Sequence, residues 1–208
     1  MASNPRKKSE TNPKYDQRRL EVLHAAARTF NRLGYHVATL DDVAEELGVT
    51  KPALYYYVKS KEELLFACGQ LALQELSTAL DRIANPDATG LDRLTRFFRT
   101  YAEMICKDFG RCLAATEPRD LVSKSHRANA AGRRSMNLAV RDMIKEGIKD
   151  GSIVPCDDRA VSIALFDAFN GLSRWVDPNG PMSVPKIADQ YIAMFTRGIA
   201  TSRTARSS

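Results

Sequence analysis

Residues 39 to 65 read TLDDVAEELGVTKPALYYYVKSKEELL and decide the fold of the N-terminal part of this chain. The stretch holds two short helical patterns joined by Gly48-Val49-Thr50. Thr39 is placed to cap the first helix, and Gly48 is placed to end it in the left-handed conformation. Thr50 suits the cap of the second helix, and Pro52 suits its first turn. Two short helices joined in this way form a helix-turn-helix, which indicates a DNA-reading module.

The second helical pattern has an aromatic surface. Leu54 and Val58 are spaced i and i+4 and are expected to face inward. The three consecutive tyrosines from Tyr55 to Tyr57 then occupy the remaining surface. Tyrosine hydroxyls can reach phosphates and ring edges can contact base methyl groups, so this composition suits a helix laid in the major groove.

Helical patterns on both sides support the DNA-binding interpretation, because similar helix pairs also occur in helical proteins that bind no DNA. Upstream, an apolar stripe from Leu20 to Phe30 ends at Gly34. Downstream, Ser60 starts a further helix and places Lys61 in its first turn, next to N–H groups that can bind phosphate. The expected order is helix, helix-turn-helix, helix.

Residues 18 to 66 closely resemble the N-terminal domain of the TetR family of one-component transcriptional regulators. The resemblance implies that base edges and phosphates are approached by different residues. Those implied at base edges are Thr50, Lys51, Pro52, Ala53 and Tyr55, and those implied at phosphates are Thr39, Tyr56, Tyr57 and Lys61. Phosphate contacts follow shared backbone geometry whereas base contacts vary with the operator, so Lys51 either reads a base or adds charge.

Composition fits this interpretation without proving it. The chain has 208 residues, 44% of them hydrophobic, which suits a small DNA-binding domain and a larger second domain. The formal net charge is +6, but the first 19 residues carry +4 and the last 12 carry +3, which leaves −1 for residues 20 to 196. The basic character therefore lies in the tails, and it does not by itself predict nucleic-acid binding.

Several classes of protein are disfavoured by the sequence. No apolar signal region and no apolar stretch of about 18 residues is seen, so we expect a cytoplasmic protein that is nucleoid-associated through DNA. The four cysteines lack CxxC spacing and no histidine cluster accompanies them, so no metal site is expected. Structural thiols are the first interpretation, with a redox pair of Cys106 and Cys112 as the alternative. No catalytic constellation or phosphate loop is present, so we expect neither an enzyme nor a cofactor.

Beyond residue 66 the chain continues in helical patterns without a strand pattern. The periodicity predicts helices over residues 61–84, 91–109, 126–149, 158–176 and 184–199, and a short segment near 113–123 that Pro118 starts or kinks. We expect an all-α protein in which a three-helix DNA-binding domain precedes a helical bundle. The expected divisions are a basic flexible arm over 1–17, the helix-turn-helix domain over 18–64, an effector-binding and dimerisation domain over 65–202, and a flexible tail over 203–208.

The last two predicted helices are rich in small and apolar residues, which suits close helix packing. In the resembled family the corresponding helices form a four-helix dimer interface. A homodimer also makes physical sense, because it places two recognition helices about one DNA turn apart on a palindrome. The alternative is that these residues form only intrachain core.

A pocket between bundle helices is a recurrent place for a ligand, and the aromatic and methionine side chains of residues 91 to 176 make one possible here. Most of these side chains are nevertheless expected to be ordinary core. The candidate effector-binding residues are Phe98, Tyr101, Met104, Met136, Phe166, Phe169, Asn170, Arg174 and Trp175.

The segment Ser173-Arg174-Trp175 and the prolines after it resemble the C-terminal region of TetR-type repressors of sterol and fatty-acid catabolism, whose effectors are acyl-CoA thioesters. The resemblance implies a repressor of a catabolic operon that leaves its palindromic operator when the effector binds. Arg174, Arg133 and Arg134 are then cationic partners for an anionic head group. Arg174 can equally pair within the chain with Asp167 or Asp177.

Four other interpretations stay open at this point. The chain can instead sense a neutral hydrophobic compound, as multidrug-type regulators do, or activate transcription rather than repress it. It can also be a helical adaptor that binds protein and not DNA. An enzymatic role would need Asp167, Asn170 and Arg174, which share a helix face at i, i+3 and i+7, to converge in one cavity.

Overall fold

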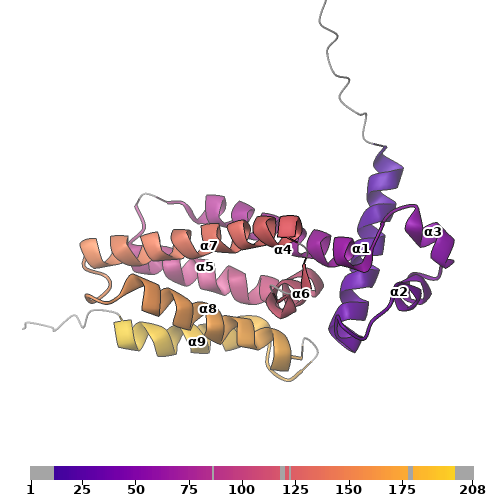
Figure 1. The fold of residues 1–208 in the computed structure, drawn as a ribbon. Coiled ribbons are helices and arrows are strands. Elements are labelled where there is room, and N and C mark those ends of the chain that lie inside the picture. Colours follow the sequence, from indigo (N-terminus) through magenta and orange to yellow (C-terminus); the bar gives the residue numbers. More distant parts are fainter. Residues whose placement is uncertain (1–11, 86, 118–119, 122, 178–179, 200–208) are drawn as a thin grey trace, which may run out of the picture.

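The fold is all-α, as the sequence predicts (Figure 1). The computed structural model describes residues 12–85, 87–117, 120–121, 123–177 and 180–199, and within these ranges the chain forms nine helices and no strand. Two apolar cores divide these helices into a small N-terminal head and a longer bundle, which we call the body.

The head contains α1 (Pro13–Leu33), α2 (Leu40–Leu47) and α3 (Lys51–Tyr55). The first turns of α4 (Lys61–Ile83) complete its core, and the rest of α4 runs on into the body (Figure 1). Buried side chains of α4 therefore belong to both cores: Leu64 and Leu65 pack in the head, whereas Leu73 and Leu76 pack in the body. A displacement of α4 therefore disturbs the packing of both the head and the body.

The body consists of α5 (Gly90–Ile105), α6 (Asp108–Ala115), α7 (Ser123–Lys149), α8 (Asp158–Trp175) and α9 (Val184–Ile199). Figure 1 shows α5, α7, α8 and α9 running lengthwise together, with the short α6 at the end that meets α1. This arrangement puts α6 between the DNA-binding head and the long helices of the body.

Most predicted helices lie where their periodicity places them. The helices α4, α8 and α9 start at the predicted residues and end within one residue of the predicted ends, and α7 begins three residues earlier than predicted. The helix α1 begins at Pro13, where the Asn12 side chain caps it by accepting from the backbone N–H of Lys14 at 3.2 Å. Residues 13 to 17, which the sequence places in the basic arm, are thus helical.

The prediction of one helix over residues 91 to 109 is wrong. The chain instead forms α5, which ends at Ile105, and then α6. After the break the chain returns against the end of α5, and the lack of a side chain on Gly110 permits this, because a Cβ atom there would lie 2.1 Å from the carbonyl oxygen of Met104. The Arg111 side chain holds the turn by donating from Nε to the carbonyl of Cys106 at 2.9 Å. The short segment predicted near residues 113 to 123 depends on Pro118, which lies outside the described residues, and α6 ends before it at Ala115.

Candidate DNA interface and effector cavity

The turn between α2 and α3 has the geometry that the sequence predicts. Gly48 adopts φ of 69°, and its N–H donates to the carbonyls of the last turn of α2. At the other end of α2, the Thr39 hydroxyl accepts from the N–H of Asp42 at 3.2 Å, while the Asp42 carboxylate accepts from the N–H of Thr39 at 2.7 Å. The hydrogen bonds from Thr39 lower the pKa of Asp42. Both ends of α2 are therefore fixed by local chemistry.

The helix α3 is short and is anchored on its inner side. Leu54 is fully buried and Val58, which follows the helix, is also buried, as predicted from their spacing. Thr50 holds the N-cap position, but the prediction that its side chain caps α3 is wrong. Pro52 supplies the physical reason, because it removes one of the two N–H groups that an N-cap hydroxyl normally binds. The exposed Thr50 hydroxyl is left available to DNA.

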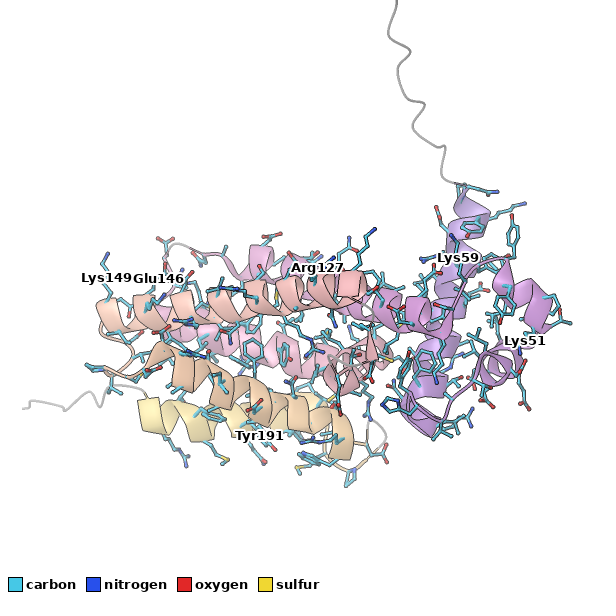
Figure 2. The ribbon with its side chains drawn as sticks, in the orientation of Figure 1. Lys51, Lys59, Arg127, Glu146, Lys149 and Tyr191 are labelled. Atoms are coloured by element: carbon cyan, nitrogen blue, oxygen red, sulfur yellow. The ribbon has the colours of Figure 1, made fainter. Side chains whose placement is uncertain are left out.

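The residues predicted to approach DNA gather on the outside of the head. Figure 2 shows Lys51 projecting from its outer edge. Tyr56 is 71% exposed and Tyr55 is 48% exposed, whereas Tyr57 is only half-exposed. The remaining predicted contacts are Thr39, Thr50, Pro52 and Ala53, which are exposed, and Lys61, which is half-buried.

Tyr15 joins this surface and was not predicted from the sequence. Its ring stacks on Tyr57 with 5.3 Å between ring centroids and meets the edge of Tyr56 at 5.7 Å. The first turn of α1 thereby orients the exposed tyrosines beside α3. The sequence signal that could have found Tyr15 is Asn12-Pro13, which is a typical helix start.

Both predicted DNA-binding lysines have partners inside the head. The Lys51 ammonium lies 2.8 Å from Asp41 Oδ2, and hydrogen bonding to Asp41 raises the pKa of Lys51. The Lys61 ammonium donates to the backbone carbonyl of His36 at 3.2 Å and lies 4.5 Å from the ring centroid of Tyr35. Among the described residues Lys61 is paired with no carboxylate, so its charge is available to phosphate, whereas Lys51 must exchange Asp41 for a phosphate.

The body contains a cavity of about 380 Å³ between α4, α5, α7 and α8. Four of the nine predicted effector residues line it: Tyr101, Met136, Phe166 and Asn170. The other lining residues are Leu73, Leu76, Leu113, Arg133, Arg134, Asn137, Ile163 and Asp167. Of these, Asn137 is spaced i+4 from Arg133, so helical spacing could have found it once Arg133 was considered.

The other five predicted effector residues do not line this cavity. Phe98, Met104 and Phe169 are almost completely buried in the core of the body, with 1%, 1% and 0% of their surface exposed. Trp175 lies at the end of α8 with 53% of its surface exposed, and Arg174 faces a different cavity. The set Asp167, Asn170 and Arg174 therefore does not converge.

Fixed polar groups interrupt the apolar wall of the effector cavity. The Tyr101 hydroxyl donates to Asn170 Oδ1 at 2.6 Å, and Asn137 Nδ2 donates to the Ser162 hydroxyl at 3.1 Å. Burial raises the pKa of Tyr101 and lowers the pKa of Arg133. The cavity therefore offers a half-buried guanidinium beside neutral hydrogen-bonding groups, while the exposed Arg134 guanidinium and the exposed Asp167 carboxylate add one charge of each sign.

A second cavity of about 390 Å³ lies between the head and the body, and Arg174 lines it. Tyr35 and His36 face it from the head, and Asp120 faces it from the body. The His36 Nε2 atom lies 3.2 Å from Oδ1 of Asp120, whose side chain is only 2% exposed. This contact joins the loop after α1 to the segment after α6.

The cysteines do not form the redox pair considered from the sequence. The Cys112 thiol donates toward Asn31 Oδ1 at 3.5 Å, and its thiol neighbour is Cys68 rather than Cys106. Hydrogen bonding to Cys112, together with burial, raises the pKa of Cys68, and burial raises the pKa of Cys106. Uncharged thiols of this kind are poor nucleophiles.

In the described part of the chain no metal-binding cluster is found. None of the helices described has the length and apolar composition needed to cross a bilayer.

Two family profiles match this chain. The profile for bacterial regulatory proteins of the tetR family matches residues 22–68, and the profile for the tetracyclin repressor-like C-terminal domain matches residues 87–199. Together they span the head and most of the body.

Individual proteins of this kind are similar over almost the whole chain. The HTH-type transcriptional repressor KstR2 of Mycolicibacterium smegmatis is 28% identical over 196 residues, which cover 89% of this chain and 92% of that protein. The ketosteroid transcriptional regulator KstR2 of Mycobacterium tuberculosis superposes with a TM-score of 0.81 at 26% identity, covering 89% of this chain and 96% of that one. AibR in complex with isovaleryl coenzyme A and operator DNA shares the fold, with a TM-score of 0.76 at 21% identity over 85% of this chain and 97% of that one.

Proposed function

The chain belongs to the TetR family of transcriptional regulators, and from that premise we propose that it is a homodimeric repressor of a catabolic operon, released from a palindromic operator by an acyl-CoA thioester. Members of this family are regulators and not enzymes. A regulator of this kind acts where the DNA is, in the cytoplasm. The observation that carries the effector proposal is the cavity in which apolar walls meet Arg133 and Arg134.

The cavity suits one part of an amphiphile better than a wholly apolar or wholly polar compound. Its volume of about 380 Å³ falls within the range of small-ligand sites. Leu73, Leu76 and Phe166 offer apolar contact for an acyl chain. The two arginines suit the phosphates of coenzyme A, because guanidinium groups bind phosphate with charge-assisted hydrogen bonds. The proposal places the acyl end inside and the charged nucleotide end toward the exposed Arg134.

A neutral hydrophobic effector fits the same walls less well. Arg133 is half-buried, and among the described residues its side chain donates only to backbone carbonyls and pairs with no carboxylate. A neutral ligand that closed the cavity would desolvate this charge further without compensating it.

KstR2, at 28% identity, is a transcriptional repressor, which supports repression and not activation.

The helix α4 offers a physical link between the effector and DNA. Leu73 and Leu76 of α4 line the cavity, while Leu64 and Leu65 of the same helix are buried in the head. A ligand that displaces the cavity end of α4 therefore moves the part of α4 on which α1 and α3 depend. In a dimer such a shift changes the separation of the two recognition helices, which lowers affinity for a palindrome of fixed spacing.

The proposed dimer uses the face formed by α8 and α9. Large apolar side chains are exposed on these helices and the loop between them: Ile163 is 45%, Met182 is 43% and Met194 is 70% exposed. Exposed apolar side chains of this size support the use of these two helices as an interaction surface.

The test of the effector proposal is a DNA-binding titration by fluorescence anisotropy. Labelled duplexes from the region upstream of the protein's own coding sequence are titrated at two salt concentrations, and acyl-CoA thioesters of increasing chain length are then added. We expect sequence-specific, salt-dependent binding that a thioester reverses and the matching free acid does not. Tight binding that no thioester changes would refute this effector class and leave the regulator intact.

The test of the dimer is sedimentation velocity. We expect the wild-type protein to sediment as a dimer and Met194→Asp to shift it toward monomer, because a carboxylate would be buried in the interface. Val37→Asp is the matched control, since Val37 is 73% exposed but lies in the head. A wild-type monomer, or equal behaviour of the two variants, would contradict the assignment of this face.

A further inference from the structure

Arg133 connects the effector cavity to the end of α6. It lies on α7 in the cavity wall, and its Nη2 group donates to the carbonyl of Leu113 and, at 3.4 Å, to the carbonyl of Thr116. These carbonyls lie in the last turn of α6 and just after it. Carbonyls at a helix C-terminus lack partners within the helix, and a cation placed there satisfies them and complements the helix dipole. Arg133 therefore caps α6 from the cavity side.

The cap is provided by a charge that has no counter-ion. Among the described residues Arg133 forms no ion pair with a carboxylate, although burial already lowers its pKa. A guanidinium that binds only neutral carbonyls can exchange them for an anion. Charge-assisted hydrogen bonds to an anion are about twice as strong as hydrogen bonds between neutral groups. An anionic ligand that enters this cavity competes directly with α6 for Arg133.

The opposite side of α6 is attached to the DNA-binding head. Asn31 of α1 donates from Nδ2 to the carbonyl of Asp108 at 2.9 Å, at the start of α6. The Cys112 thiol lies 3.7 Å from the carbonyl of Ala27. His24 places its ring 4.5 Å from that of Phe109. Because α6 contacts the middle of α1 directly, a movement of α6 displaces α1.

We propose that Arg133 is the positioning residue through which the charge of the effector is coupled to the DNA-binding head. When the cavity holds no anion, Arg133 holds the end of α6 and α6 holds α1. An anion takes the guanidinium, the last turn of α6 loses its cap, and α6 shifts against α1. A neutral compound occupies the cavity without releasing DNA, because it leaves Arg133 on α6. This inference rests on the proposed effector site and adds that release requires a negative charge.

The test compares two probes that share one acyl group and differ in charge. Isovaleryl-CoA carries the phosphates, whereas the isovaleryl thioester of N-acetylcysteamine is neutral. Binding of each probe is measured by calorimetry, and its effect on operator affinity is measured at saturation of the protein. For the wild-type protein we expect the CoA thioester to weaken operator binding at least about tenfold, within the usual range of allosteric coupling. The neutral thioester should weaken it less than about twofold by the same reasoning.

Three variants separate coupling from binding. Arg133→Met should reduce the effect of saturating CoA thioester to less than about twofold, and Arg133→Lys should retain an intermediate effect. Arg134→Met should bind the thioester more weakly but keep the full effect at saturation, because the exposed Arg134 contributes no cap to α6. Arg127→Met is the control for a charge on α7 outside the cavity (Figure 2) and should match the wild type in both measurements.

Hydrogen exchange gives a readout that needs no ligand. The N–H of Thr116 donates to the carbonyl of Cys112 at 3.0 Å in the capped turn, and we expect it to exchange faster in Arg133→Met than in the wild type. Wild-type release by CoA thioester that persists in Arg133→Met, or unchanged exchange in that variant, would overturn the role of Arg133 and leave the proposed function standing. Failure of the CoA thioester to release the wild type would instead refute the proposed effector, and with it the role of Arg133.

Discussion

The hydrogen bond between Tyr101 and Asn170 is the most direct place to test whether the cavity wall is built as described. The Tyr101 hydroxyl donates to Asn170 Oδ1 at 2.6 Å, and Tyr101 is only 5% exposed. Tyr101→Phe removes the donor and keeps the ring, whose stacking on Phe97 at 5.8 Å should persist. The change therefore isolates one hydrogen bond between α5 and α8.

The expected cost is about 1 kcal/mol of unfolding free energy, the usual net value of one neutral hydrogen bond. Water can replace part of the lost interaction because Asn170 lines the cavity, which keeps the cost from exceeding about 1.5 kcal/mol. In a chain of this length that loss lowers the unfolding midpoint by about 2–4 °C. Tyr55→Phe is the matched control, since Tyr55 is exposed in the head and its hydroxyl has no hydrogen bond within the described residues, and it should change stability by less than about 0.5 kcal/mol.

The assay is urea denaturation at one protein concentration, because a dimer's apparent stability depends on concentration. The single variants Tyr101→Phe and Asn170→Ala are combined in a double-mutant cycle, and we expect a coupling energy of about 1 kcal/mol. Additivity of the two changes within about 0.3 kcal/mol would show that the hydroxyl and the amide do not interact, and it would refute this view of the cavity wall.

Three further predictions concern the DNA surface and the junction of α5 with α7. If Lys51 binds phosphate, Lys51→Ala should reduce the slope of log affinity against log salt concentration by about 1 per protomer. If Lys51 instead contacts a base, the slope should stay unchanged and only the affinity for the cognate duplex should fall. Gly90→Ala should cost about 1–3 kcal/mol of stability, because the new Cβ would lie 2.1 Å from the backbone nitrogen of Gly147. Gly171→Ala should instead gain up to about 1 kcal/mol from helix propensity, because the new Cβ would approach only the Arg174 side chain, at 3.9 Å. Equal denaturation midpoints for the two variants would contradict the packing. Asp150→Asn should destabilise the protein at neutral pH, because hydrogen bonds from Ser152 and then from the N–H of Gly90 lower the pKa of Asp150 below its ordinary 3.8. The stabilisation is fully present above pH 3.8 and is lost as the pH falls through the lowered pKa, so a difference from the wild type that does not shrink as the pH is lowered below 3.8 would contradict it.

The parts of the fold that depend on local chemistry could be predicted from the sequence. Thr39 and Gly48 fix the ends of α2 through contacts within a few residues, and Ser60 does the same for α4 by accepting from the N–H of Glu63 at 3.0 Å. The break between α5 and α6 could not be predicted in this way. Phe109 continues the apolar spacing of Ile105, and the close packing of Gly110 against Met104 at the end of α5 leaves no mark in that spacing.

Which residues line the effector cavity could also not be predicted from local sequence patterns. Phe166 lines the cavity and Phe169 is fully buried, although both lie on α8 and have the same chemistry. Their roles differ only by the rotation of the helix against its neighbours, which periodicity alone does not determine. Arg133 illustrates the converse, since its charge is visible in the sequence while its position at the end of α6 depends on how α7 packs.

The central claim, that operator and effector exclude one another, is tested most directly by measuring thioester affinity twice, for the free protein and for the operator complex. Calorimetric titration with isovaleryl-CoA and longer thioesters should give a weaker affinity for the complex, by the same factor by which the thioester weakens operator binding. Equal affinities in the two titrations, or no binding of any thioester to the free protein, would contradict the account.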